Sequence, residues 1–153
     1  MNETPGAIWV DADACPVPIK EMLFKAAART GMSLTLIANH SMRVPSGDNI
    51  RLILVPKGYD VADNRLTAEV TSGDLVVTSD IPLAAELIEK GAEVVNPRGD
   101  IYSVENIKAR LTMRDFMETM RASGVQSGGP APLSAKDRQK FAGVLDRYCQ
   151  SRH

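Results

Sequence analysis

Short apolar runs alternate with amphipathic stretches along the first two thirds of the chain. The runs are rich in Val, Ile and Leu, which is typical of buried β-strands. They predict five strands, at residues 7–10, 33–38, 50–55, 75–78 and 93–95. Glycine or asparagine separates many of these segments, as expected where helices and strands end.

Between most of the strands, apolar side chains recur three and four residues apart, which predicts helices with one buried face. The first helix is expected to begin near Pro16 and to stop at Gly31. Further helices are expected after Asp60, a candidate N-cap, and after Asp80. No such pattern fits between the second and third strands, so the direction in which these two strands pair stays open.

From residue 103 onward the pattern is helical only. Ser, Thr and Asp side chains at suitable spacing mark where helices begin. Candidate starts lie at Ser103, at Thr112 with Asp115, and at Ser134 with Asp137. We therefore expect two helices before residues 123–133, a loop rich in Gly, Pro and Ser, and a last helix after it.

This order of elements predicts an α/β fold with a mainly parallel five-stranded sheet flanked by helices. A chain of 153 residues with 44% hydrophobic residues suits one domain with a single core. We expect residues 1–153 to form that domain, with residues 103–153 as a helical C-terminal extension packed on it. The pattern leaves open whether the chain forms a homo-oligomer.

Eighteen basic residues nearly balance nineteen acidic ones, so any contact with nucleic acid is expected to be local. Two cysteines, Cys15 and Cys149, provide neither a disulfide framework nor a zinc site. A reducing cytoplasm is therefore the expected location. No apolar run approaches the ~18 residues of a membrane span, so we expect no membrane partner.

Aspartates follow three of the predicted strands. Asp11 and Asp13 come directly after the first, Asp60 and Asp63 follow the third, and Asp80 follows the fourth. Because the carboxyl ends of parallel strands meet at one edge of a sheet, these side chains are expected to converge there. Carboxylates held together repel each other, and a hard cation such as Mg²⁺ or Mn²⁺ relieves that repulsion.

Each of these residues also has an ordinary structural interpretation. Asp60 and Asp63 could serve only to cap a helix, and Asp80 could be the N-cap of the helix that follows it. Asp11 and Asp13 are harder to explain in this way, because two charges directly after a buried strand cost free energy.

Polar and basic residues expected near the same edge are candidates to hold substrate. They are Asn39, Arg43, Lys57 and Arg98. Arginine offers a bidentate fork to phosphate, although these side chains could equally just neutralise the aspartates. His40 could contact substrate or metal, or simply face solvent. Cys15 lies near a helix start, where a thiolate is stabilised, but a packing role is favoured.

Several motifs resemble those of the YaiI/YqxD family of bacterial proteins. They are DADACP at residues 11–16, GYDVAD at 58–63, TSDIPLA at 78–84 and NPRG at 96–99. Matches at residues 111–117 (LTMRDFM), 128–130 (GGP) and 137–138 (DR) extend the resemblance over nearly the whole chain.

The resemblance implies a PIN-like fold, the fold of metal-dependent nucleases with a parallel sheet and clustered acidic residues. Within it, Asp11 is similar to the first-strand aspartate, and residues 78–84 are similar to the acidic motif at a strand end. Asp60 or Asp63 would supply a further acidic residue. Fold alone does not imply function, so the activity must be argued from the site.

The leading hypothesis is therefore a metal-dependent nuclease, with RNA as substrate and partner. Asp11, Asp13 and Asp80 would be catalytic and, with Asp60 and Asp63, would bind Mg²⁺ or Mn²⁺. A second hypothesis is a non-catalytic RNA-binding or regulatory module with the same fold. A third is a phosphatase of the haloacid-dehalogenase type, with Asp11 as nucleophile and Asp13 as acid/base, although the Thr and Lys of that family have no clear counterparts.

Overall fold

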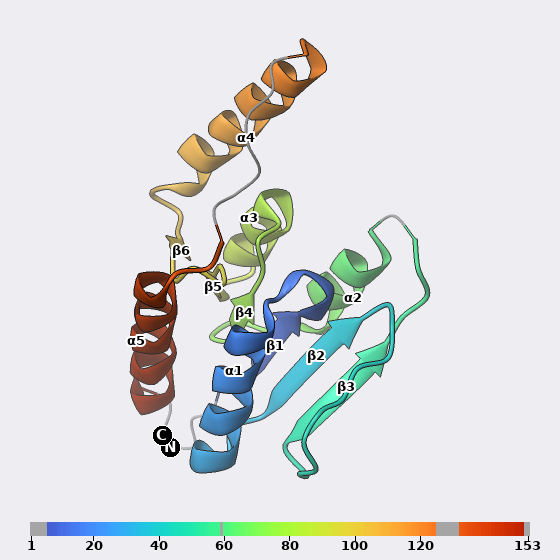
Figure 1. The fold of residues 1–153 in the computed structure, drawn as a ribbon, viewed down its shortest axis with the longest axis vertical. Coiled ribbons are helices and arrows are strands. Elements are labelled where there is room, and N and C mark those ends of the chain that lie inside the picture. Colours follow the sequence, from blue (N-terminus) through green and yellow to red (C-terminus); the bar gives the residue numbers. More distant parts are fainter. Residues whose placement is uncertain (1–5, 59, 125–131, 152–153) are drawn as a thin grey trace.

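The computed structural model describes residues 6–58, 60–124 and 132–151. In it, six strands form one sheet in the order β3-β2-β1-β4-β5-β6 (Figure 1). Their bounds are β1 Ile8–Asp11, β2 Leu34–Ala38, β3 Ile50–Leu54, β4 Leu75–Val77, β5 Glu93–Val95 and β6 Ile101–Tyr102. The predicted α/β class and mainly parallel sheet are confirmed, as are all five predicted strands.

The sheet has one strand more than predicted. The sixth, β6, comprises Ile101 and Tyr102 and runs antiparallel to β5. A hairpin joins the two strands, and in it the backbone N–H of Asn96 donates to the carbonyl of Asp100. Two residues are too short a run to produce a periodic pattern, which is why the prediction missed this strand.

Strands β2 and β3 pair in parallel, which settles the direction that the sequence left open. An irregular segment, rather than a helix, returns the chain from the end of β2 to the start of β3. Asn49 anchors this crossover, because its side-chain amide donates to the carbonyls of Ala27 and Met32 at 2.9 and 2.8 Å. Met42 and Val44 of the same segment pack against the core that a crossover helix would otherwise cover.

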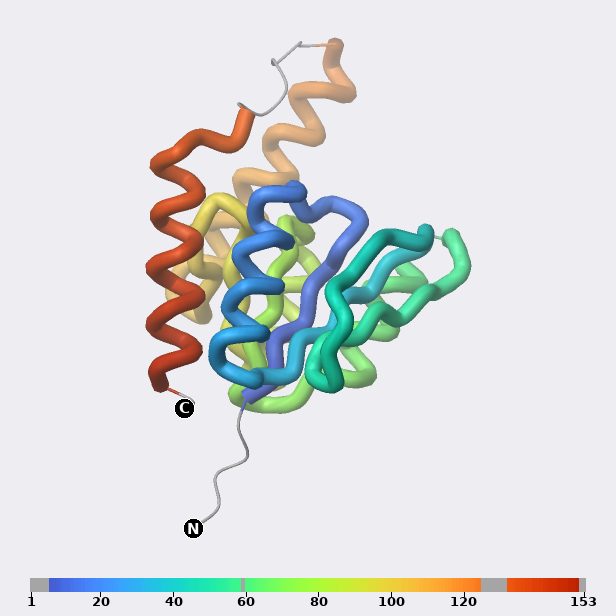
Figure 2. The backbone as a smooth tube through the Cα atoms, turned by 60° about the horizontal axis from the view of Figure 1, so that its bottom comes forward, coloured from blue at the N-terminus to red at the C-terminus, as the bar shows by residue number. Residues whose placement is uncertain are grey.

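Four helices cover the two faces of the sheet. Their bounds are α1 Val17–Thr30, α2 Val61–Glu69, α3 Ile81–Glu89 and α5 Ala135–Ser151. Helices α1 and α5 pack together on one face, and α2 and α3 pack on the other (Figures 1 and 2). Alternation along β1 explains the two layers, because Ile8 and Val10 point into the first core and Trp9 into the second. Gly31 ends α1 in a left-handed conformation, as expected for a C-terminal glycine.

Helix α4, Ile107–Ala122, is a single helix that contacts α3 and extends away from the body of the protein (Figure 1). The prediction of two helices here was wrong. The Thr112 hydroxyl donates to the carbonyl of Lys108 at 3.0 Å, one turn back, instead of capping a new helix. The Ser134–Asp137 capping box is confirmed by two reciprocal bonds of 3.1 and 3.0 Å. Most of the predicted loop 123–133, including its GGP motif, lies outside the described residues.

The NPRG motif at residues 96–99 forms the turn on which the start of α5 rests. Gly99 is buried with φ +86°, and a Cβ there would lie 2.6 Å from the backbone nitrogen of Phe141. Arg98 donates to Asp137 of α5 at 2.6 Å. Glycine is therefore required both by the backbone conformation and by the close approach of α5.

A buried carboxylate, Asp74, closes the other end of the sheet, where the strands begin. It accepts hydrogen bonds from the backbone of Ala7 and the indole of Trp9 at 3.1 and 3.0 Å. It also accepts from the backbone N–H and the hydroxyl of Thr71 at 2.9 and 3.1 Å.

Among the described residues, no helix is both long and apolar enough to cross a membrane.

Candidate functional site

Strands β1 and β4 are neighbours at the centre of the sheet, and the chain turns in opposite directions on either side of them. Their carboxyl ends therefore form the switch point at which open α/β sheets bind ligands. Asp11 ends β1, and Thr78 follows β4. The buried hydroxyl of Thr78 donates to Oδ2 of Asp11 at 2.9 Å, which fixes the carboxylate between the two strands.

The pKa of Asp11 is raised above its usual value. Burial is the largest cause, because it disfavours the charged carboxylate, and the nearby charges of Asp80 and Asp13 add to it. The hydrogen bond from Thr78 acts in the opposite direction. Asp11 is thus a half-buried acid that other acids surround.

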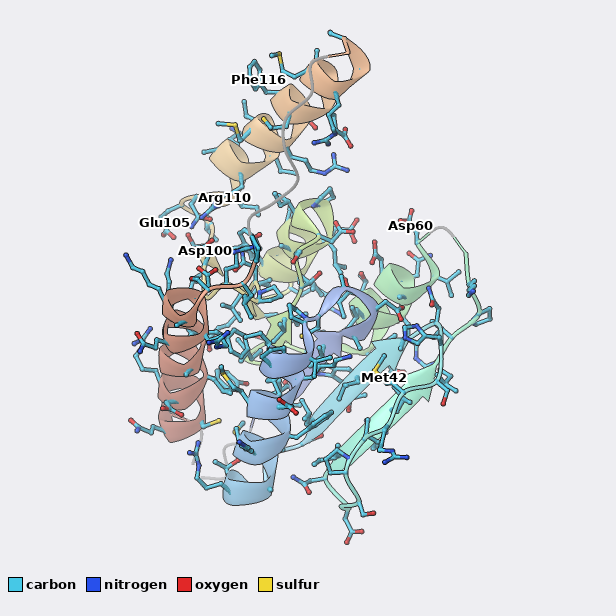
Figure 3. The ribbon with its side chains drawn as sticks, viewed as in Figure 1. Met42, Asp60, Asp100, Glu105, Arg110 and Phe116 are labelled. Atoms are coloured by element: carbon cyan, nitrogen blue, oxygen red, sulfur yellow. The ribbon has the colours of Figure 1, made fainter. Side chains whose placement is uncertain are left out.

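Helix α2 brings two more carboxylates to this edge. Asp60 precedes the helix, and its φ of 61° lies in the left-handed region that few residues other than glycine adopt. Asp60 occupies the N-cap position of α2, as predicted, but its side chain makes no capping hydrogen bond. Figure 3 shows Asp60 where the chain enters the first turn of α2. Asp63 lies in the first turn of the helix and is half-buried.

Asp63 is the most perturbed acid of the site. Burial and the charge of Asp80, to which Asp63 is also hydrogen-bonded, raise the pKa of Asp63 to about 7. The charges of Asp11 and Asp60 contribute further. The four side chains come from β1, α2 and the start of α3, so tertiary structure brings them together. This is the convergence that the positions of the strand ends indicated.

Asp80 has two roles in this arrangement. Its Oδ1 accepts the backbone N–H of Leu83 at 3.0 Å, so it caps α3 as its structural interpretation predicted. Its own N–H donates to the Thr78 hydroxyl at 3.1 Å, which ties it to Asp11 through one shared group. The capping hydrogen bond therefore orients the carboxylate of Asp80, which still lies close enough to Asp63 to raise its pKa.

Asp13 lies close to Asp11 but is directed elsewhere. Its Oδ2 accepts the backbone N–H of Asn39 at 2.9 Å, and its Oδ1 lies 2.8 Å from Nδ1 of His40. Asp13 therefore links the 3₁₀ turn after β1, Ala12–Ala14, to the end of β2. These two contacts with Asp13 hold Asn39 and His40 at the edge of the acidic cluster.

A pocket of about 290 Å³ opens beside α2 and α3. Its lining includes the carboxylates of Asp60, Asp63, Asp80 and Glu86, together with Arg114 of α4. Sequence reasoning did not single out Arg114 or Glu86. The LTMRDFM motif at residues 111–117 contains Arg114 and was the available signal, but the place of this arginine beside the acids depends on the direction in which α4 leaves β6.

The basic residues predicted to hold substrate do not gather in this pocket. Arg98 is bound to Asp137, and it lines a separate hollow with Asn96 and Leu133. Arg43 lines a groove between α1 and the crossover segment. Lys57 is exposed between β3 and α2. Of these three, Lys57 lies closest in sequence to the acidic cluster.

The donor set has the chemistry of a Mg²⁺ or Mn²⁺ site. Both ions prefer carboxylate oxygens, and Mg²⁺ is commonly held by one or two carboxylates, water and substrate phosphate. Within residues 6–58, 60–124 and 132–151, however, no three acidic, histidine or cysteine side chains form a ready metal-binding group. The described residues therefore form no closed cage, and a cation bound here would need further ligands from water or substrate.

Both cysteines are free and buried. Burial raises the pKa of Cys15 to about 12, and burial also raises the pKa of Cys149. A thiol that stays protonated at neutral pH is a poor nucleophile. Cys15 packs in the core between the sheet and α1, which agrees with the packing role favoured from the sequence.

The fold and the site define an α/β protein with clustered carboxylates at the switch point of its sheet. Comparison with known proteins narrows this class to one family. The family model described as uncharacterised BCR, YaiI/YqxD family matches residues 9–151. The chain therefore belongs to the YaiI/YqxD family. The resemblance seen in the motifs is confirmed over nearly the whole chain.

Relatives in other bacteria support the same assignment. A UPF0178 protein of Shewanella amazonensis is 62% identical over 141 residues, which cover 92% of this chain and 95% of that protein. A UPF0178 protein of Thioalkalivibrio sulfidiphilus is 59% identical over 145 residues, which cover 95% and 99%. No solved structure matches the chain significantly. The family description assigns no activity, so function must be argued from the site.

Proposed function

We propose that the protein is a divalent-metal-dependent phosphodiesterase that acts on RNA. The observation that carries the proposal is the convergence of Asp11, Asp63 and Asp80, with the pKa of Asp63 raised to about 7. Carboxylates that repel each other destabilise a folded chain unless a proton or a cation compensates them. A fold that keeps them together at its switch point is well explained by a cation-binding role.

One or two carboxylates among Asp11, Asp63 and Asp80 would hold Mg²⁺ or Mn²⁺, with water and substrate phosphate as the other ligands. Asp60 and Asp13 would lie at the margins of the site. When bound, such an ion supplies Lewis acidity that stabilises a phosphoryl transition state. The protein's own contribution is orientation. The Thr78 hydroxyl holds Asp11, and the N-terminus of α3 holds Asp80, so both carboxylates are fixed before a ligand arrives.

The size of the pocket is compatible with a phosphate group but does not select a polymer. At about 290 Å³ it lies at the lower end of the roughly 300–1,000 Å³ usual for pockets that enclose small ligands. The choice of RNA as substrate therefore rests on the resemblance of the motifs to those of PIN-like nucleases.

The phosphatase hypothesis finds less support. It needs Asp13 as a mobile acid/base, yet both oxygens of Asp13 are engaged by Asn39 and His40. The non-catalytic module remains the main alternative, because an acidic cluster can bind a cation without cutting anything. A cleavage assay separates it from the nuclease.

The experiment measures cleavage of a labelled single-stranded RNA with Mn²⁺ and with EDTA, in wild type and in Asp11→Asn, Asp63→Asn and Asp80→Asn. Asparagine keeps an acceptor for Thr78 at Asp11 and is as good an N-cap as Asp80. We expect Mn²⁺-dependent cleavage that falls at least about 100-fold in each variant, as when charge stabilisation of the transition state is lost. The matched control is Asp48→Asn, on the exposed crossover segment.

Cleavage that persists unchanged in the three variants would remove the mechanism. Absence of cleavage combined with Mn²⁺ stabilisation of the wild type would instead favour the non-catalytic module. Thermal unfolding with increasing Mn²⁺ measures that stabilisation, since a ligand that binds only the folded state raises the unfolding temperature.

A further inference from the structure

The acidic pocket carries a strong imbalance of charge. Among the described residues that line it, four are carboxylates and Arg114 is the cation. Metal ions would neutralise carboxylates, but phosphate oxygens that face away from the ions still need donors. A guanidinium suits that task, because its planar fork donates two parallel hydrogen bonds to a phosphate.

Arg114 reaches the pocket from α4, the helix that extends beyond α3 (Figures 1 and 2). The base of α4 is fixed, because the guanidinium of Arg110 lies 5.5 Å from the centre of the Tyr102 ring. Arg114 lies one helical turn further along. Figure 3 shows Arg110 at the base of α4 and Phe116 further out along it. The helix therefore holds Arg114 beside the acids while its outer turns extend past them.

The present contacts of Arg114 are weak enough to be exchanged. Its guanidinium contacts both carboxylate oxygens of Glu118 at 3.4 Å and lies 3.5 Å from Asp115, both on its own helix. Both distances exceed those of a tight charge-assisted hydrogen bond, which lie at about 2.7–2.9 Å. Exposed pairs of this kind contribute little to stability. A phosphate in the pocket would compete with them successfully.

We infer that Arg114 binds the substrate phosphate in the acidic pocket, so that α4 is the arm that holds an RNA backbone against the carboxylates. The inference rests on the proposed function and specifies its substrate contact. It also adds Arg114 to the substrate-binding candidates named from the sequence, one of which, Arg98, is bound to the start of α5. The role is one of binding and orientation, because Arg114 would donate hydrogen bonds without exchanging a proton.

The test compares Arg114→Ala, Arg114→Lys and Arg121→Ala. Arg121 lies on the exposed last turn of the same helix and does not line the pocket, so its variant is the matched control for loss of one positive charge. Two quantities are measured. One is the Kd for a labelled phosphorothioate RNA, by fluorescence anisotropy with Mn²⁺, and the other is the Mn²⁺ concentration that half-stabilises the protein in thermal unfolding.

We expect Arg114→Ala to raise the Kd for RNA about 10- to 100-fold, Arg114→Lys to restore part of the loss, and Arg121→Ala to change it less than about threefold. The Mn²⁺ midpoint should not rise in any of the three variants, because none removes a carboxylate, and it should fall in Arg114→Ala, which removes a positive charge from the pocket. Equal RNA affinity in Arg114→Ala and wild type, with Mn²⁺ binding intact, would overturn this inference and leave the proposed function standing. Failure of Mn²⁺ to stabilise the wild type would instead count against the proposed function.

Discussion

Replacing Asp63 with asparagine should stabilise the metal-free protein at alkaline pH. The pKa of Asp63 is raised from 3.8 to about 7 in the fold, chiefly by burial and by the charge and hydrogen bond of Asp80. The folded state therefore binds this proton more tightly than the unfolded chain does. Its contribution to stability is fully present below the unfolded pKa and is lost as the pH rises through about 7.

The magnitude follows from that difference. A pKa shift of one unit corresponds to about 1.4 kcal/mol, so the raised pKa of Asp63 lowers the free energy of unfolding at alkaline pH by at most about 4 kcal/mol. Asp63 is half-exposed, and water screens its interactions, so we expect ~1–2 kcal/mol. Asparagine is neutral at every pH and keeps a hydrogen-bonding group toward Asp80. The free energy of unfolding of Asp63→Asn should thus exceed that of wild type by ~1–2 kcal/mol near pH 8, and the difference should disappear near pH 4.

Urea unfolding followed by circular dichroism, with EDTA present and at several pH values, measures this gap directly. Asp48→Asn serves as control, since Asp48 is exposed on the crossover segment. Adding Mn²⁺ should reverse the order of stability, because asparagine is a poorer ligand than carboxylate. A gap that is absent near pH 8, or that does not change with pH, would refute the idea that crowded carboxylates strain this site.

Three further changes test other parts of the fold. Asp74→Ala removes the acceptor for four hydrogen bonds and should cost ~2–4 kcal/mol in urea unfolding without changing Mn²⁺ binding; a loss below ~1 kcal/mol would contradict this. Gly99→Ala places a Cβ 2.6 Å from the backbone nitrogen of Phe141 at a residue with positive φ, and should lower the free energy of unfolding by more than ~2 kcal/mol. An unchanged melting temperature would contradict this steric argument. Glu118→Gln releases Arg114 and should tighten RNA binding about twofold, whereas weaker binding would argue that the pair positions the arginine.

Much of the fold could be predicted because local patterns determine it. The apolar runs gave all five longer strands, and Gly31 and the Ser134–Asp137 box marked helix ends that the structure contains. The prediction failed where two local signals compete. Thr112 resembles an N-cap in sequence, but its hydroxyl bonds back to Lys108 and the helix continues.

The candidate site could be predicted only in part, for a similar reason. Asp11 and Asp80 were expected to be close if their strands were neighbours, and the strand order makes them so. The parallel pairing of β2 and β3 had no pattern to reveal it, because an irregular segment connects them. Arg114 lies 34 positions after Asp80 in the sequence, and nothing near either residue indicates that they share a pocket.

The packing of α5 against α1 has a consequence for how the chain is made. Phe141, Leu145 and Tyr148 complete the core beneath Ile8 and Val10, residues that lie far earlier in the chain. The part of this face that α1 does not cover thus stays open to water until α5 has been synthesised. Such long-range closure favours slow, post-translational folding. A product truncated before α5 would expose that apolar face and be removed by proteases before its acidic cluster could bind anything.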